Sequence, residues 1–130
     1  MAGLKYSKQR ASIKDYLMHT TSHPTADTVY LHIKEEFPNI SLGTVYRNLN
    51  LLCENGQLLK VPIPGASDRF DHTLCWHSHM YCTVCCCVVD ADVDEKQVMK
   101  LVKNQKGVVQ DCAVVLFGVC EECLKKQAAQ

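Results

Sequence analysis

The chain has 130 residues, enough for one ordinary domain or two small ones, and its hydrophobic fraction of 47% argues against disorder. No apolar run approaches the roughly 20 residues of a membrane span, and a formal net charge of zero argues against an undirected binder of polyanions. Residues 1–64 carry seven Lys/Arg and five Asp/Glu, whereas residues 65–130 carry seven and nine, which fits a nucleic-acid reader joined to a metal-binding half.

The first 55 residues predict three helices. Ser7 is the expected N-cap of the first, which ends by His23–Pro24 because a residue before proline avoids the helical region. Thr25 caps the second helix and Ser41 the third, which stops at Gly56. The expected apolar stripes are Ala11, Ile13 and Leu17, then Ala26, Val29, Ile33 and Phe37, then Leu42, Val45, Leu49 and Leu52.

Two short β-like runs follow, Leu58–Pro62 and Asp68–Asp71, with a turn at Pro64–Gly65 between them. Two strands after three helices predict a wing attached to a helix-turn-helix. A hinge expected at Thr73–Trp76 divides the chain into an N-terminal domain, residues 1–73, and a second domain, residues 74–130.

The second half predicts a mixed arrangement, so the fold class expected for the whole chain is α+β. The expected elements are strands at His79–Cys82 and Cys86–Val89, a helix at Asp94–Gln105, a strand at Val108–Gly118, and a short helix after the last cysteine pair. The polar tail from Lys125 to Gln130 is expected to fray.

The third helix carries a second, polar face that suits the major groove of DNA. Its members are Gly43, Thr44, Tyr46, Arg47 and Asn50. Arg47 can bind a guanine edge or a phosphate, and Tyr46 can contact a phosphate or a thymine methyl group. The alternative is an ordinary surface face of a three-helix domain, because helix-turn-helix patterns have low specificity.

Two Cys-x-x-Cys pairs, Cys82/Cys85 and Cys120/Cys123, predict a site of four thiolates that suits tetrahedral Zn²⁺. The alternative is a disulfide framework of the kind found in secreted scaffolds, or a set of free thiols. Against disulfides, the cysteine count of nine is odd and the first residues show no apolar segment of a signal peptide. We therefore expect a cytoplasmic, reducing compartment, no membrane association and a zinc site.

Nitrogen and oxygen ligands stand beside the sulfur pairs and predict a second, harder metal site. His77 and His79 are two residues apart, so on a strand both side chains project to one face, and Asp90 follows the first cysteine pair. This arrangement predicts one metal with a structural role and another with a separate role.

Several motifs, taken in their order along the chain, resemble the ferric uptake regulator (Fur) family from about Ser7 to Lys126. They are His23-Pro24-Thr25-Ala26-Asp27, Ser41-x-x-Thr44-Val45-Tyr46-Arg47-x-Leu49, Arg69-Phe70-Asp71, His77-x-His79-x-x-Cys82-x-x-Cys85 and Gly118-Val119-Cys120-x-x-Cys123. The resemblance implies a winged-helix domain, a hinge and an α/β dimerisation domain. It also implies a homodimeric, metal-dependent transcription factor, usually a repressor, that binds a pseudo-palindromic operator in double-stranded DNA.

The resemblance further assigns residues to sites. The structural zinc ligands would be Cys82, Cys85, Cys120 and Cys123; the regulatory metal ligands His23, Asp71, His77, His79 and Asp90; and the DNA-binding residues Ser41, Thr44, Tyr46, Arg47 and Asn50. Three imidazoles and two carboxylates suit Fe²⁺ or Mn²⁺, and also Zn²⁺. Aspartate at both carboxylate places resembles the peroxide-sensing branch, in which Fe²⁺ and peroxide oxidise a ligand histidine, here His23 or His77.

Three other functions stay open at this point. An iron- or zinc-uptake regulator would use the metal as a simple corepressor. A small zinc hydrolase would use the histidines and aspartates around an open metal, and a thiol redox protein would use Cys85, Cys86 and Cys87. The last two of these cysteines depart from the family, which usually has Gly-Lys there; Asp111–Cys112 also departs from it and makes a third metal site doubtful.

Overall fold

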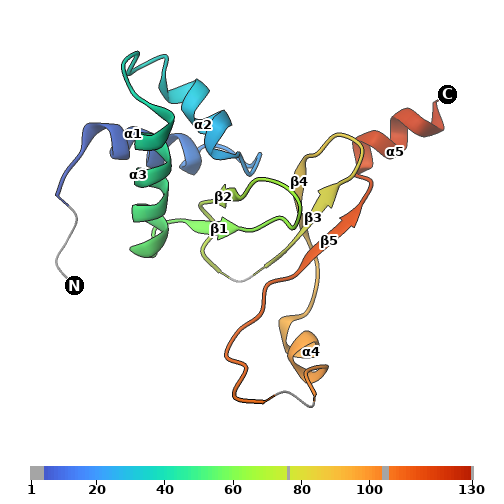
Figure 1. Cartoon of the computed structure of the whole chain (residues 1–130). Coiled ribbons are helices and arrows are strands. Elements are labelled where there is room, and N and C mark those ends of the chain that lie inside the picture. The colour runs from blue at the N-terminus through green and yellow to red at the C-terminus, as the bar shows by residue number, and fades with distance from the viewer. Residues whose placement is uncertain (1–4, 76, 104–105, 130) are drawn as a thin grey trace. The chain divides into compact units, whose positions relative to one another are not determined.

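The protein is described here by a computed structural model that covers residues 5–75, 77–103 and 106–129. The chain divides into two units, Met1–Leu74 and Cys75–Gln130. The predicted α+β class is confirmed by the order of elements, with helices first and strands mixed with helices afterwards (Figure 1). Among the helices of the described residues, none is both long and apolar enough to cross a bilayer.

The first unit begins with α1 (Lys8–Met18), α2 (Ala26–Ile33) and α3 (Leu42–Glu54). Each begins as predicted at a hydroxyl N-cap whose side-chain oxygen accepts a backbone N–H three residues later. The pairs are Ser7 with Arg10, Thr25 with Thr28, and Ser41 with Thr44. Asn55 and the left-handed Gly56, at φ +71°, end α3.

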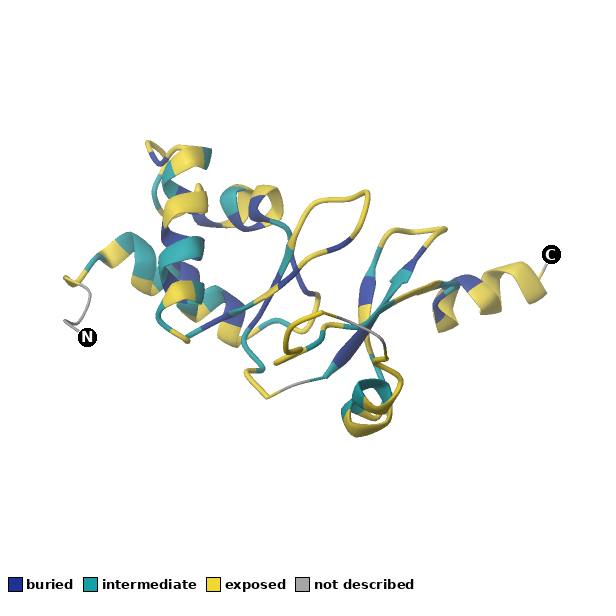
Figure 2. Cartoon of the chain, turned by 60° about the horizontal axis from the view of Figure 1, so that its bottom comes forward, coloured by how far each residue is buried: buried dark blue, intermediate teal, exposed yellow. Residues whose placement is uncertain are grey.

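One apolar core joins these three helices to the strand that carries Phe70. Buried residues alternate with exposed ones along each helix, as the amphipathic stripes predict (Figure 2). The core consists of Ile13, Leu17, Ala26, Val29, Ile33, Ile40, Val45, Leu49, Leu52, Leu58 and Phe70.

Three details of the helical prediction are wrong. Ala11 is exposed, because a residue two positions from buried Ile13 lies on the opposite side of a helix. α1 ends at Met18 rather than near His23–Pro24, since the proline sets only the latest end and the hydroxyl residues before it favour turns. Phe37 packs against the core from beyond the end of α2.

The wing of the first unit is an antiparallel pair, β1 (Leu59–Val61) and β2 (Arg69–Asp71). β2 is also tied to the segment before α2. The Phe70 N–H donates to the Pro24 carbonyl at 3.1 Å, and the Arg69 guanidinium donates to the His23 carbonyl at 3.2 Å. The fold therefore fixes His23 beside the end of β2, where Asp71 stands.

The second unit is built on a three-stranded sheet in the order β4-β3-β5. Its elements are β3 (Ser78–Cys82), β4 (Val88–Ala91), α4 (Glu95–Lys100), β5 (Val115–Gly118) and α5 (Glu121–Ala128). β4 runs antiparallel to the central β3 and pairs Asp90 with His79, whereas β5 runs parallel to β3 and pairs Gly118 with Cys82.

Boundaries in this unit differ from the prediction. β4 begins at Val88 rather than Cys86, because residue 86 adopts a left-handed conformation at φ +66°. β5 covers only the end of Val108–Gly118, since β3 offers a short ladder. α4 ends at Lys100, while the predicted end at Gln105 lies outside the described residues, as does Trp76 of the predicted hinge. α5 begins within the second cysteine pair and extends through much of the tail that was expected to fray (Figure 2).

Phe70→Ala tests whether the wing is packed into the hydrophobic core of the three helices. The side chain is 1% exposed, so its removal should lower the free energy of unfolding of the first unit by about 3–5 kcal/mol. Leu31→Ala, at a 67% exposed position of α2, is the matched control and should change it by less than about 0.5 kcal/mol. Urea unfolding followed by circular dichroism measures both, and equal effects would contradict the assignment of Phe70 to the core.

Candidate metal centres and nucleic-acid face

The four cysteines of the predicted zinc site converge in the second unit. Cys82 ends β3, Cys85 lies in the turn after it, Cys120 is the N-cap of α5 and Cys123 lies in its first turn. Their sulfur atoms lie within 4.8 Å of one another, with Cys82–Cys123 at 3.9 Å and Cys85–Cys120 at 3.8 Å. A tetrahedron with Zn–S bonds of about 2.3 Å has edges of about 3.8 Å, so the donor set fits zinc.

Backbone amides prepare this cluster for a cation-bound, thiolate state. The amides of Cys85 and Cys120 each donate to the Cys82 sulfur at 3.4 Å and lower the pKa of Cys82 to about 6. The Cys123 amide likewise lowers the pKa of Cys120, whereas burial raises the pKa of Cys123 to about 12. Zinc must therefore displace a proton from Cys123 in particular, because a thiol has to be deprotonated before it binds the metal.

The turn that carries Cys85 contains a bulge. The Cys86 amide donates to the Cys82 carbonyl at 2.9 Å, and the Cys82 amide donates to the Cys87 carbonyl at 2.9 Å. With Cys86 at φ +66°, this is the pattern of a bulge whose first residue is usually glycine. Cys87 follows it, half-buried, and packs against the sulfur cluster.

Two of the predicted regulatory ligands lie together in the first unit. The His23 Nε2 atom is 3.0 Å from the Asp71 Oδ2 atom, and both side chains are buried. His23 has φ +51°, a conformation unusual for a residue with a side chain and maintained by the contacts of its segment with β2. The other Asp71 oxygen accepts the Thr73 amide at 2.9 Å, which orients the carboxylate.

The other three predicted ligands lie together in the second unit, with ligand atoms within 4.8 Å of one another. The Asp90 Oδ1 atom is 3.1 Å from His77 Nε2 and 3.7 Å from His79 Nε2, and the two rings are 4.3 Å apart. His79 and Asp90 face each other because they are register partners on β3 and β4. His77 Nδ1 is 2.9 Å from the Cys75 carbonyl, a partner that leaves Nε2 for a metal.

The predicted DNA face of α3 is an exposed surface of the first unit. Tyr46 is 39% exposed and Arg47 is exposed, with its guanidinium 3.3 Å from the Thr44 hydroxyl. Ser41 is the helix cap and also contacts the Thr44 hydroxyl at 2.9 Å. Ser41 therefore has a structural role at the helix N-terminus, where backbone N–H groups suit phosphate.

Two residues near this face were missed by the sequence analysis. Lys60 of β1 donates to the Asn50 Oδ1 atom at 2.8 Å, which adds a cation from the wing to the face of α3. Asn48 is 6% exposed and accepts from Arg10 at 3.4 Å, so this polar residue is part of the helix packing. The alternation of side chains along a strand could have indicated that Lys60 faces solvent. No pattern in the sequence indicated that the polar Asn48 would be buried.

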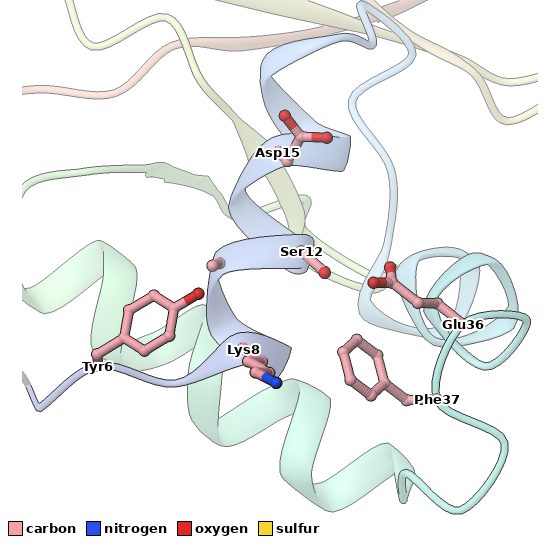
Figure 3. Close-up of a pocket in the computed structure, with 7 residues that line it drawn as sticks. Tyr6, Lys8, Ser12, Asp15, Glu36 and Phe37 are labelled. Carbon is pink, nitrogen blue, oxygen red and sulfur yellow. The ribbon is translucent and has the colours of Figure 1, made fainter.

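A hollow of about 700 Å³ lies between α1 and the segment that follows α2. Figure 3 shows Ser12 and Lys8 of α1 pointing toward Glu36 and Phe37 of that segment. Asp15 and Tyr6 complete the labelled lining. None of the nine predicted metal ligands lines this hollow, so it belongs to neither metal centre.

The family resemblance carried by the motifs is confirmed by comparison with known proteins. The sequence model described as "Ferric uptake regulator family" matches residues 1–117. The peroxide operon regulator of Bacillus subtilis (strain 168) is 36% identical over 129 residues, covering 96% of this chain and 88% of the relative. The peroxide-responsive repressor PerR of Staphylococcus aureus (strain Mu50) is 32% identical over 127 residues, covering 96% and 86%.

Solved structures agree with the sequence relatives. The Campylobacter jejuni peroxide stress regulator is 29% identical, with a TM-score of 0.68 and 88% of each chain covered. The Helicobacter pylori ferric uptake regulator Fur, described as having three functional metal-binding sites, is 25% identical, with a TM-score of 0.73 and 94% of this chain and 83% of that chain covered. The family model and the relatives show that this chain, with its four converging cysteines and its histidine and aspartate pairs, belongs to the ferric uptake regulator family.

Proposed function

We propose that this protein is a homodimeric, metal-dependent transcriptional repressor that senses peroxide through oxidation of a ligand histidine. The observation that carries the proposal is the presence of two chemically distinct kinds of ligand, four sulfurs in the second unit and imidazoles with carboxylates in each unit. The relatives support the peroxide signal, because several are named as peroxide regulators. A cytoplasmic location is expected, because cysteines stay reduced there and can bind a metal. The cytoplasm also contains the DNA that a repressor would bind.

The sulfur set is assigned to structural zinc. Cys82, Cys85, Cys120 and Cys123 would bind one Zn²⁺ and leave no open position, as structural zinc sites do. Zinc at this place would join the β3–β4 turn to α5 and replace thiol protons with metal–sulfur bonds. The role assigned to these residues is to maintain the second unit, and thereby the dimer.

The imidazole and carboxylate sets are assigned to one regulatory ion. His23 with Asp71 supplies one nitrogen and one oxygen, and His77, His79 and Asp90 supply two nitrogens and one oxygen. Each set alone is small for Fe²⁺ or Mn²⁺, whereas the N₃O₂ total suits either ion. An ion that required both sets would favour one arrangement of the units, which is a population shift toward the DNA-binding state.

The peroxide response follows from where this ion would be held. Fe²⁺ at the site would supply the electrons that activate hydrogen peroxide. One peroxide oxygen would then enter a ring C–H bond of His23 or His77, and the other would leave as water. The modified ring would no longer match the ligand set, so the DNA-binding arrangement would be lost. The protein is altered by this event, which makes it a single-use sensor rather than an enzyme.

DNA binding is assigned to the exposed face of α3, with Thr44, Tyr46, Arg47 and Asn50 in the major groove and Ser41 at the phosphate. Dimerisation is assigned to the second unit, in which β5 is an edge strand that exposes Leu116 by 43% and Phe117 by 51%. A second copy covering this surface would present two α3 helices to a pseudo-palindromic operator.

Cys82→Ser should prevent zinc binding and dimer formation. Structural Zn²⁺ contributes roughly 10–16 kcal/mol of apparent binding free energy in zinc-finger peptides, and a small domain has a net stability of only about 5–15 kcal/mol. Zinc content by mass spectrometry and dimer mass by light scattering measure the effect, with Cys53→Ser in the first unit as control. A zinc-free variant that still forms a stable dimer would disprove the structural role.

Arg47→Ala should weaken operator binding and leave the dimer intact. If Arg47 reads a base, discrimination at one position should fall by about 1–3 kcal/mol. If it binds a phosphate, binding to all sequences should weaken alike and depend less steeply on salt. Fluorescence anisotropy over a salt series separates the two, with Lys34→Ala at the end of α2 as control. Unchanged affinity would show that α3 does not read DNA.

His23→Ala should retain zinc and the dimer and lose metal-dependent operator binding, because the first unit would keep only Asp71 as a ligand. In the Fe²⁺-loaded wild type, brief peroxide exposure should add one oxygen atom to a peptide containing His23 or His77, whereas the Mn²⁺ form should resist. Peptide mass spectrometry decides the outcome, with His19→Ala as control at an exposed histidine. Oxygen found only on Cys85, Cys86 or Cys87 would replace the histidine mechanism with a thiol mechanism.

A further inference from the structure

Cys87 is a fifth sulfur beside the four-cysteine cluster, and no role in metal binding has been assigned to it. Its half-buried side chain packs against Cys82, Cys120 and Cys123. Its backbone carbonyl accepts the Cys82 amide at 2.9 Å, which holds Cys87 beside the first of these ligands. Cys87 therefore adjoins the sulfur cluster from the same turn that carries Cys85.

The four predicted ligands differ in exposure. Cys82, Cys120 and Cys123 are buried, whereas Cys85 is exposed in the turn. An oxidant or alkylating agent in solution would therefore reach Cys85 before the other three. This most exposed ligand lies in the same turn as Cys87, two residues before it.

We propose that Cys87 is a reserve zinc ligand that takes the place of Cys85 when Cys85 is lost. In the intact site the Cys87 thiol would stay protonated and donate to the ligand thiolates, as an outer partner of the metal site does. When Cys85 is lost, the Cys87 thiol would give its proton to water and a zinc–sulfur bond to Cys87 would form in place of the bond to Cys85. The exchange needs no redox partner.

The backbone permits this exchange within one turn. Cys85 and Cys87 flank Cys86, whose left-handed conformation creates the bulge, while Cys82 holds both sides of it through its backbone amide and carbonyl. Movement of Cys87 toward zinc would therefore involve this turn and leave β3, β5 and α5 in place.

The test compares zinc binding in three variants, with excess Mn²⁺ present to occupy the harder site. Cys85→Ser should retain one zinc per chain. X-ray absorption at the zinc edge should show four Zn–S bonds of about 2.3 Å. Cys85→Ser/Cys87→Ser should lose zinc to a chromogenic chelator at least about tenfold faster and show at least one shorter Zn–O or Zn–N bond. Cys85→Ser/Cys86→Ser, the matched control, should behave as Cys85→Ser does.

The proposal rests on the four-cysteine zinc site, so Cys82→Ser is measured alongside. Zinc bound as tightly in Cys82→Ser as in the wild type would overturn that site itself. If Cys82→Ser loses zinc and Cys85→Ser loses it equally, or fails to fold, Cys87 is no reserve ligand. The proposal would also be overturned if zinc in Cys85→Ser had only three sulfur ligands. Equal rates of zinc release from Cys85→Ser and Cys85→Ser/Cys87→Ser would have the same meaning.

Discussion

The convergence of four sulfur atoms is the interaction on which the second unit depends. The first unit has an apolar core of eleven buried residues drawn from three helices, the segments that follow α2 and α3, and the wing. In the described part of the second unit, the buried hydrophobic residues are Cys82, Val88, Cys120 and Cys123. A unit of this size with so little buried carbon needs another source of stability, and a structural metal is one of the few available. Metal–sulfur bonds would supply to the second unit the stability that buried leucine and isoleucine side chains supply to the first.

The sequence predicted those features that depend on local chemistry. Each hydroxyl cap formed where a serine or threonine preceded an amphipathic stripe, as at Ser41, because a cap needs only its own next three residues. The two-residue spacing of His77 and His79 predicted that both side chains lie on one face, and their ring centroids are 4.3 Å apart. The bounds of elements were less predictable, since β5 begins only at Val115, where β3 supplies a partner in His79. No periodicity could show that Lys60 would reach Asn50, because that contact depends on how the wing packs against α3.

The proposed division of the ligands between two metals would separate the maintenance of the fold from the sensing of the signal. A sulfur site with three of its four cysteines buried and with amides directed at Cys82 is suited to permanent occupancy. The imidazole and carboxylate sets include Asp90, which is 63% exposed and so open to exchange with solvent. One chain can thus hold one metal tightly and another loosely. A sensor requires this difference in affinity, because a signal that removed both metals would unfold the second unit as well as release the DNA.

The amides that point at Cys82 also bear on how the zinc centre assembles. The Cys85 amide reaches that sulfur from within the same turn, so the first cysteine pair can adopt its geometry without the rest of the unit. Bringing Cys120 to the same sulfur joins residues 38 apart, and closing such a loop has a length-dependent entropy cost of about 3 kcal/mol. An arriving ion would accordingly be captured first by the β3–β4 hairpin and then recruit α5. Assembly would begin at the hairpin and end at the C-terminal helix. During synthesis, competing metals would therefore meet an intermediate in which only Cys82 and Cys85 are available as ligands.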